Sequence, residues 1–100
     1  MKKIYLAGSG GMLGEAFYEV FTNEYNIQAS DINLTEKWIN YLDFRDFNKY
    51  RKDVMSFNPD YLFHLGAITS LEECDLDQNK AYSTNTLAVE NATIIANELN

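Results

Sequence analysis

A glycine-rich turn between two different hydrophobic patterns constrains the fold of this 100-residue chain more than any other feature. Before the turn, residues 4–7 form a continuous apolar run, which is typical of a strand covered on both faces in a parallel sheet. After it, apolar residues recur at i, i+4 and i+8, and each is followed directly by a second apolar residue. This pattern predicts an amphipathic helix. The apolar stripe of this helix consists of Met12, Leu13, Ala16, Phe17, Val20 and Phe21.

Further strand and helix patterns follow along the chain. Residues 27–30, 38–42 and 61–65 have the length and apolar content of strands, while residues 47–57 and 77–99 have helical periodicity. The predicted order of elements is therefore β-α-β-β-α-β-α. Strands that are separated by helices indicate right-handed crossovers in a parallel sheet. We expect an α/β fold with a doubly wound parallel sheet in the strand order 3-2-1-4.

The later helices have recognisable apolar faces. The helix over residues 47–57 ends before Pro59, because proline disfavours helical backbone in the residue that precedes it. Its apolar face consists of Phe47, Tyr50, Val54 and Phe57. In the last predicted helix, the residues expected to face inward are Ala81, Leu87, Ala88, Ala92, Ile94, Ile95 and Leu99.

Charge and composition exclude several classes of protein. Eight Lys and Arg against fifteen Asp and Glu give a net charge of −7, so binding to nucleic acid or to an anionic membrane is not expected. No stretch approaches the ~18 consecutive apolar residues of a membrane span, and the apolar run behind Lys2 and Lys3 is too short for a signal peptide. The single cysteine, Cys74, allows no internal disulfide, and the carboxylates beside it disfavour a reactive thiolate. We expect one small domain in a cytoplasmic protein.

Residues 8–14 (Gly-Ser-Gly-Gly-Met-Leu-Gly), which we call the glycine loop, have the composition of a phosphate-binding turn. Glycine leaves no β-carbon where a pyrophosphate approaches, and the start of the following helix offers free N–H groups and its positive dipole end. We expect the N–H groups of Met12 and Leu13 to bind the pyrophosphate, with Gly11 allowing its close approach. An ordinary turn between strand and helix is the competing interpretation, but the strand before, the helix after and Asp31 beyond favour dinucleotide binding.

The spacing Gly8-x-x-Gly11-x-x-Gly14, with Gly10 as an extra glycine, resembles the short-chain dehydrogenase/reductase superfamily, specifically its extended, sugar-nucleotide-modifying branch. The resemblance implies that the predicted sheet is the N-terminal portion of a Rossmann-type domain. It also implies a nicotinamide dinucleotide as cofactor. The protein would orient this cofactor and provide its electrostatic environment, and the cofactor would supply the chemistry.

Two further passages strengthen the resemblance, which covers essentially the whole chain. Residues 64–67 (His-Leu-Gly-Ala) are similar to the stretch that runs alongside the cofactor in that branch. Glu73-Cys74 and residues 82–85 (Tyr-Ser-Thr-Asn) are similar to a passage of the dTDP-4-dehydrorhamnose reductases. The departures are small: Ala7 stands where Thr is usual, and Gly66 stands where Ala is usual.

The resemblance assigns roles to residues beyond the glycine loop. Asp31 would accept the hydroxyls of the adenosine ribose and would repel a 2′-phosphate, which favours NAD, with NADP possible. Asp43 would contact the adenine amino group, although Asp43 and Asp46 could both simply cap the following helix. Asn85 would be the asparagine of the family's fourth helix, or would only tie that helix to the preceding loop. The implied cofactor-binding residues are Gly8, Gly10, Gly11, Met12, Leu13, Gly14, Asp31, Ile32, Asp43, Phe44, Leu65, Gly66, Ala67 and Asn85.

The catalytic pair of the superfamily, a Tyr with a Lys four residues later, has no counterpart here, since none of the seven tyrosines has Lys at i+4. We therefore expect the N-terminal third of a reductase, truncated after about four strands, with the substrate domain absent and no activity alone. The expected substrate of the full-length parent is a nucleotide-sugar. His64 lies in an apolar strand and is expected to be a core or cofactor-flanking histidine; metal binding would need a second ligand nearby.

Two other functions remain open at this point. An epimerase or dehydratase of the same branch would share every feature described so far, and a non-catalytic dinucleotide sensor would suit the missing Tyr and Lys. A homo-oligomer is also possible, because the strand over residues 61–65 would form a sheet edge although its composition is that of an interior strand.

Overall fold

The structure, a computed structural model, describes residues 1–65 and 88–99. Its elements in chain order are β1 (Lys3–Ala7), α1 (Met12–Phe21), β2 (Asn26–Asp31), β3 (Ile39–Tyr41), α2 (Phe47–Phe57), β4 (Tyr61–His64) and α5 (Ala88–Glu98). The four strands in this part of the chain form one parallel sheet in the order β3-β2-β1-β4. This confirms the predicted α/β, Rossmann-type topology and the strand order 3-2-1-4. The predicted long helix is confirmed from Ala88 onward, and its first part lies outside the described residues.

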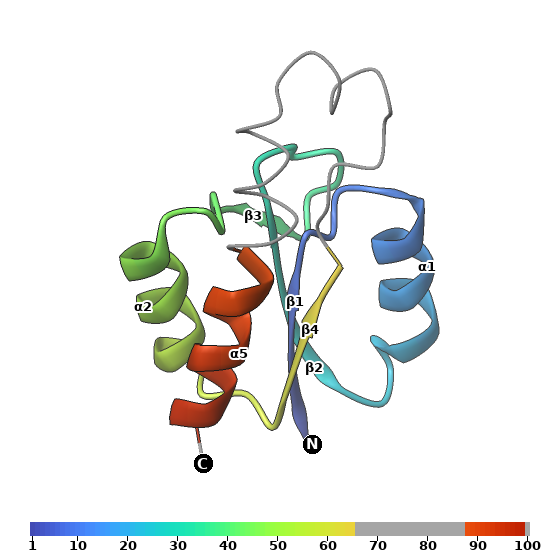
Figure 1. Ribbon diagram of the computed structural model, residues 1–100. Coiled ribbons are helices and arrows are strands. Elements are labelled where there is room, and N and C mark those ends of the chain that lie inside the picture. Colours follow the sequence, from blue (N-terminus) through green and yellow to red (C-terminus); the bar gives the residue numbers. More distant parts are fainter. Residues whose placement is uncertain (66–87, 100) are drawn as a thin grey trace.

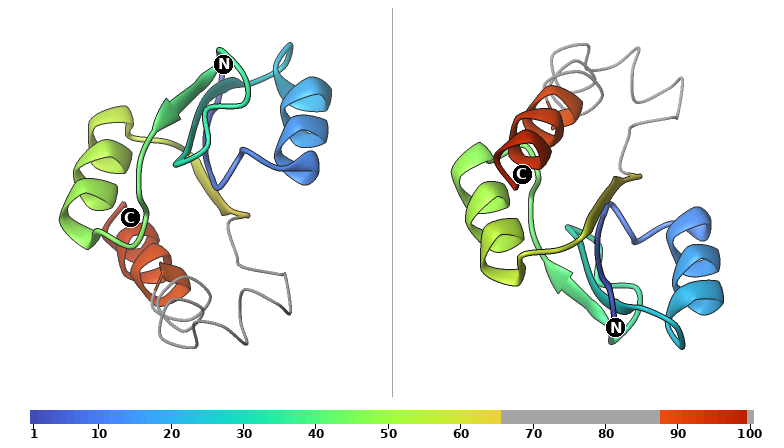
Figure 2. Two further views of the ribbon diagram at one scale, coloured as in Figure 1. Left: turned by 90° about the horizontal axis from the view of Figure 1, so that it is seen from above. Right: turned by 90° about the horizontal axis from the view of Figure 1, so that it is seen from below.

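Helices cover both faces of the sheet. α1 lies on one side, and α2 and α5 lie together on the other, as the side view and both end views show (Figures 1 and 2). β1 runs through the middle of the sheet, and Tyr5, Leu6 and Ala7 in it are fully buried. The continuous apolar run of the sequence therefore reflects burial on both faces, as expected for an interior parallel strand.

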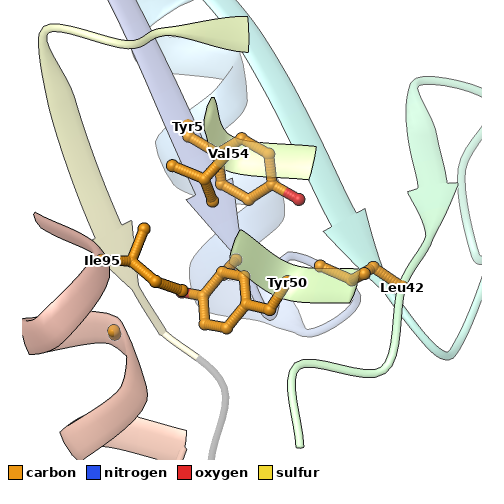
Figure 3. Close-up of a cluster of buried hydrophobic side chains, with 7 residues drawn as sticks. Tyr5, Leu42, Tyr50, Val54 and Ile95 are labelled. Atoms are coloured by element: carbon orange, nitrogen blue, oxygen red, sulfur yellow. The ribbon is translucent and has the colours of Figure 1, made fainter. Parts of the chain in front are cut away.

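The main core lies between the sheet and the α2–α5 pair. Figure 3 shows Tyr50 and Val54 of α2 meeting Tyr5 of β1, with Leu42 and Ile95 completing the cluster. Tyr5 and Tyr50 have ring centroids 6.3 Å apart. The predicted buried face of α2 is therefore confirmed, since its spacing of three to four residues puts these side chains on one side of the helix.

Local sequence sets the ends of α2. The Asp46 carboxylate accepts a hydrogen bond from Lys49 N at 3.2 Å and caps the first turn. At the other end Asn58 adopts the left-handed conformation, with φ 52°, and its N–H donates to the carbonyl oxygen of Val54. Pro59 follows directly and cannot continue the helix.

The apolar stripe predicted for α1 is only partly buried. Gly14 is buried and Phe17, Tyr18 and Phe21 are half-buried, so the face at i, i+3, i+4 and i+7 meets the sheet. In that contact Phe17 lies 4.9 Å, between ring centroids, from Phe63 of β4. The other stripe residues lie on the neighbouring face of α1 and are exposed: Met12 by 87%, Leu13 by 65% and Val20 by 66%, together with Ala16.

Two smaller expectations also need correction. Ile94, expected to face inward, is 48% exposed, because Ala88, Ala92 and Ile95 form the buried face of α5. β3 spans three residues rather than the five predicted for residues 38–42. None of the helices within the described part of the chain is long and apolar enough to cross a membrane.

Candidate functional site

The glycine loop begins where β1 ends, at the edge of the sheet to which the carboxyl ends of the parallel strands point (Figure 1). Gly8 has φ 78°, a left-handed backbone conformation that a side chain would disfavour. In the sheet register Ala7 pairs with Ser30 on one side and with His64 on the other. The loop therefore leaves the sheet between the ends of β2 and β4, which is where parallel α/β sheets bind ligands.

One backbone carbonyl anchors the first half of the glycine loop. The oxygen of Ser30 accepts hydrogen bonds from Gly8 N at 2.9 Å, from Ser9 N at 3.1 Å and from Ser9 Oγ at 3.1 Å. Ser9 and Ser30 are each 1% exposed, so these bonds are shielded from water. A carbonyl with three donors fixes the direction in which the chain leaves β1.

The side chain of Asp31 holds the next part of the loop. Its Oδ2 accepts from Gly10 N at 2.9 Å, and its Oδ1 accepts from Asn33 N at 2.9 Å. A β-carbon on Gly10 would lie 2.9 Å from Asp31 Cγ, so glycine is needed at this position to admit the carboxylate. Two carboxylate oxygens offer about four acceptor sites. Asp31 can therefore hold the loop and still accept hydroxyl groups, and its predicted contact with a ribose stays a prediction.

The third glycine of the predicted motif serves packing inside the protein. A β-carbon on Gly14 would lie 2.4 Å from the carbonyl oxygen of Ser9, a distance that no real contact shows. The first turn of α1 therefore rests directly on the loop backbone. The last glycine of a dinucleotide-binding turn has this same role: it lets the helix pack closely against the strand.

Gly11 differs from the other two, because a β-carbon here would meet no atom of residues 1–65 and 88–99 within 4 Å. Its φ of −104° is also accessible to any residue, so neither packing nor backbone conformation requires glycine. The open space beside it lies at the start of α1, where Gly11 is the N-cap and makes no side-chain capping bond. A glycine in this position leaves room for a group outside the chain.

The start of α1 offers hydrogen-bond donors to that space. The first bond of the helix runs from Glu15 N to the oxygen of Gly11 at 3.1 Å, so Met12, Leu13 and Gly14 precede the first intrahelical donor. Such N–H groups and the positive end of the helix dipole together can bind an anion. The space beside Gly11 and the N–H groups at the start of α1 together provide the room and the hydrogen-bond donors that the diphosphate of a dinucleotide requires.

Asp43 lies two residues after the end of β3, at the same edge of the sheet, and its carboxylate is paired with Arg45. Oδ2 accepts from Arg45 Nη2 at 2.7 Å, and Oδ1 accepts from Arg45 Nε at 2.9 Å and from Arg45 N at 3.0 Å. The hydrogen bonds from the guanidinium hold the pKa of the Asp43 carboxyl below its usual range. Asp46, not Asp43, caps α2 by accepting from Lys49 N. The predicted contact of Asp43 with adenine stays a prediction.

The remaining predicted residues lie in different environments. Leu65 N donates to the oxygen of Ala7 at 2.8 Å, which extends the pairing of β1 and β4 to the start of the glycine loop. Phe44 packs against the main core, and Ile32, next to Asp31, is 46% exposed. Gly66, Ala67 and Asn85 lie outside the described residues.

His64 has the environment of a core histidine. Its ring lies against Phe44, with centroids 4.6 Å apart, and its Nδ1 lies 3.0 Å from the hydroxyl of Tyr50. Burial raises the pKa of the Tyr50 hydroxyl above its usual value, so this phenol stays protonated and can donate to the imidazole. Within residues 1–65 and 88–99, no three His, Cys, Asp or Glu side chains gather as metal ligands would.

Sequence reasoning missed a polar cluster beneath the loop, which we call the Tyr5 network: Tyr5 and Ser30 are buried in it, and Gln28 and Asp53 are half-buried. The Tyr5 hydroxyl is hydrogen-bonded to Asp53 Oδ2 and to Ser30 Oγ. Burial, and then the hydrogen bond to Asp53, raise the pKa of this hydroxyl far above its usual value. A tyrosine within an otherwise aliphatic strand was the available signal, since a buried hydroxyl requires a partner.

Comparison with known proteins gives a consistent family assignment. The family described as the RmlD substrate binding domain matches residues 1–100. A curated dTDP-4-dehydrorhamnose reductase of Aggregatibacter actinomycetemcomitans is 23% identical over 90 residues, which are 90% of this chain and 29% of that protein.

Solved structures with the same fold include an L-threonine dehydrogenase and a dTDP-4-dehydrorhamnose reductase. An L-threonine dehydrogenase from Clostridium difficile is 27% identical, with a TM-score of 0.88 over 99% of this chain and 34% of that one. A dTDP-4-dehydrorhamnose reductase from Bacillus anthracis, solved in complex with NADP, is 23% identical, with a TM-score of 0.84 over 99% of this chain and 34% of that one. The chain thus spans about a third of the length of these relatives.

Proposed function

Because the chain belongs to the RmlD substrate binding domain family, we propose that it is the dinucleotide-binding portion of an NAD(P)-dependent sugar-nucleotide oxidoreductase similar to dTDP-4-dehydrorhamnose reductase. The observation that carries the proposal is Gly11. It is a glycine that neither packing nor backbone conformation requires, and it lies where the free N–H groups of α1 begin. The likeness to a reductase solved with NADP supports a nicotinamide dinucleotide as the ligand.

In this proposal each part of the site has a separate task. The N–H groups of Met12 and Leu13 bind the pyrophosphate, while Ser30 and Asp31 hold the loop in place. Asp31 accepts the ribose hydroxyls, Asp43 contacts the adenine, and the segment from Leu65 onward runs beside the cofactor. When bound, the nicotinamide would supply hydride transfer to or from C4 of a nucleotide-linked hexose. The chain's own contribution is to bind and orient the cofactor.

The substrate and the reaction of the whole protein are part of the same proposal. The curated relative is a dTDP-4-dehydrorhamnose reductase, which favours a nucleotide-sugar substrate and a reductase over an epimerase or dehydratase. None of the tyrosines in these 100 residues has a Lys four residues later, so the chain alone is expected to bind the cofactor without turnover.

Calorimetric titration with NADH tests the proposal. The unaltered chain should bind NADH, and Gly11→Val should abolish the binding, because a branched side chain fills the space beside the helix start. Ala16→Val is the control: it places a valine at an exposed position of α1 five residues further along the chain and should leave the affinity unchanged. Equal affinity of Gly11→Val and the unaltered chain would overturn the assignment of the glycine loop.

A further inference from the structure

The Tyr5 network lies directly beneath the carbonyl that anchors the glycine loop. We propose that this network is a positioning device, which sets the loop in the geometry that receives the diphosphate of a nucleotide ligand. The inference rests on the proposed function and deepens it by adding residues that do not touch the ligand. It is carried by hydrogen bonds that connect Asp53 on α2 to the end of β2 and from there to Gly8 and Ser9.

The network is continuous and has defined donors and acceptors. Asp53 Oδ2 accepts from the Tyr5 hydroxyl at 2.5 Å and from Gln28 Nε2 at 3.2 Å. The Tyr5 oxygen also lies 2.9 Å from Ser30 Oγ. A phenol has one proton, and a carboxylate only accepts, so the Tyr5 proton goes to Asp53 while the Ser30 hydroxyl donates to Tyr5. Each polar group in this chain of bonds therefore has a partner.

Ser30 connects the network to the loop. Its side chain bonds to Tyr5, and its backbone oxygen accepts three hydrogen bonds from Gly8 and Ser9. The next residue, Asp31, holds Gly10 N through its carboxylate. The bond to Tyr5 therefore fixes Ser30. The position of the loop depends on Ser30 through its carbonyl oxygen and on the next residue, Asp31, through its carboxylate.

Burial alone does not account for a polar network at this place. The other buried positions of β1 are Ile4, Leu6 and Ala7, which fill their sites without a polar group. Polar groups in a core cost desolvation, and apolar side chains of similar volume are often as stable, whereas satisfied polar networks specify one geometry. Tyr5 is fully buried at the strand that leads into the loop, where a defined geometry would serve ligand binding.

Two tyrosines in the chain provide a matched test. Tyr5→Phe removes the hydroxyl that bonds to Asp53 and Ser30, and Tyr50→Phe removes an equally buried hydroxyl that bonds instead to His64. Binding of ADP, which carries a diphosphate, and of adenosine, which carries none, is measured for both variants and for the unaltered chain. Tyr5→Phe should weaken ADP binding about threefold or more and leave adenosine binding unchanged, while Tyr50→Phe should change neither.

A second pair of variants tests the same network from α2. Asp53→Ala removes the acceptor at a half-buried helix position, and Asp53→Asn keeps an oxygen that can accept the Tyr5 proton. Asp53→Ala should weaken ADP binding as Tyr5→Phe does, and Asp53→Asn should restore most of the affinity. This pair answers the question also if Tyr5→Phe does not fold.

The possible failures are distinguishable. Absence of ADP binding by the unaltered chain would overturn the proposed function and this inference with it. Gly11-dependent ADP binding that is equally strong in Tyr5→Phe and Asp53→Ala would overturn the inference alone. Equal weakening of ADP and adenosine binding would also overturn it, because that result indicates general loosening of the fold rather than a displaced loop.

Discussion

A β-carbon placed on Gly14 would lie 2.4 Å from the carbonyl oxygen of Ser9, so α1 and the glycine loop pack without room for a side chain. Gly11, three residues earlier, has no atom from the described part of the chain within 4 Å of the place where its β-carbon would be. Two glycines of one motif therefore have different reasons to be glycine. Gly14 serves the fold, and we propose that Gly11 leaves room for a ligand that approaches the helix start.

This difference predicts that the same substitution to serine destabilises the fold at Gly14 and leaves its stability nearly unchanged at Gly11. Gly14→Ser should lower the free energy of unfolding by about 2 kcal/mol or more, because the overlap with Ser9 forces the backbone to shift. Gly11→Ser should stay within about 0.5 kcal/mol of the unaltered chain, because serine is a favourable N-cap and its β-carbon would meet no atom among the residues that the structure describes. Urea denaturation followed by the fluorescence of Trp38, the single tryptophan, measures both. Equal destabilisation by the two variants would contradict this division of roles.

The hydrogen bonds of Asp31 lead to a prediction about cofactor choice. Its carboxylate is held beside the loop by Gly10 N and Asn33 N, where a 2′-phosphate on the ribose would be a like-charge neighbour. We expect NAD to bind at least about tenfold more tightly than NADP, which is about 1.4 kcal/mol. Asp31→Asn keeps the shape and an oxygen for Gly10 N, and it should reduce this preference.

Calorimetric dissociation constants for NAD and NADP, measured with the unaltered chain and with Asp31→Asn, provide the comparison. The structural relative from Bacillus anthracis was solved with NADP. For this chain, the predicted preference for NAD rests on the charge of Asp31. A clear preference of the unaltered chain for NADP would show that Asp31 serves only to hold the loop.

The ion pair of Asp43 and Arg45 predicts a dependence of stability on pH. The pKa of Asp43 is lowered in the folded chain, chiefly by the guanidinium of Arg45. Its contribution to stability is therefore fully present above the unfolded pKa of about 3.9 and is lost as the pH falls through the lower folded value. Arg45→Gln should return the Asp43 pKa toward its ordinary value. Carboxyl titration by NMR tests this, and an unchanged low pKa in Arg45→Gln would refute the assignment to Arg45.

The edge of the sheet at β4 predicts self-association. Among the described strands β4 pairs only with β1, and its Tyr61 and Phe63 are 44% and 37% exposed. The strand itself contains neither Pro nor Lys, so the side of β4 that faces away from β1 can pair with another chain. We expect dimers or larger species in light scattering.

A charge on this edge should reduce the association. Tyr61→Glu places a carboxylate on β4, close to Lys2, whose Nζ lies 5.7 Å from the centre of the Tyr61 ring. Tyr41→Glu makes the same change on β3, the short strand at the opposite edge, and should leave the association unchanged. A monomer at high concentration of the unaltered chain would contradict the prediction.

The order and type of the elements could be predicted from the sequence because they depend on local patterns. The apolar run of β1, the glycine loop and the stop at Pro59 each act within a few residues. The edge position of β4 followed from the same patterns together with the usual strand order.

Features that depend on packing between distant segments could not be predicted in the same way. The exposure of Met12 and Leu13 depends on which side of α1 meets the sheet, and Gly14 determines that side through its contact with Ser9. The bond between Tyr5 and Asp53 joins residues 48 positions apart and requires the docking of α2 onto β1. The pairing of Asp31 with Gly10 N depends on the register of β2 beside β1.

The central claim is that the N–H groups at the start of α1 bind a diphosphate, and NMR observation of the backbone amides during titration with ADP tests it most directly. The account predicts that the amide signals of Met12 and Leu13 shift together and saturate, and that these shifts are absent in Gly11→Val. Saturable ADP binding that leaves both signals in place, or that persists in Gly11→Val, would contradict the account.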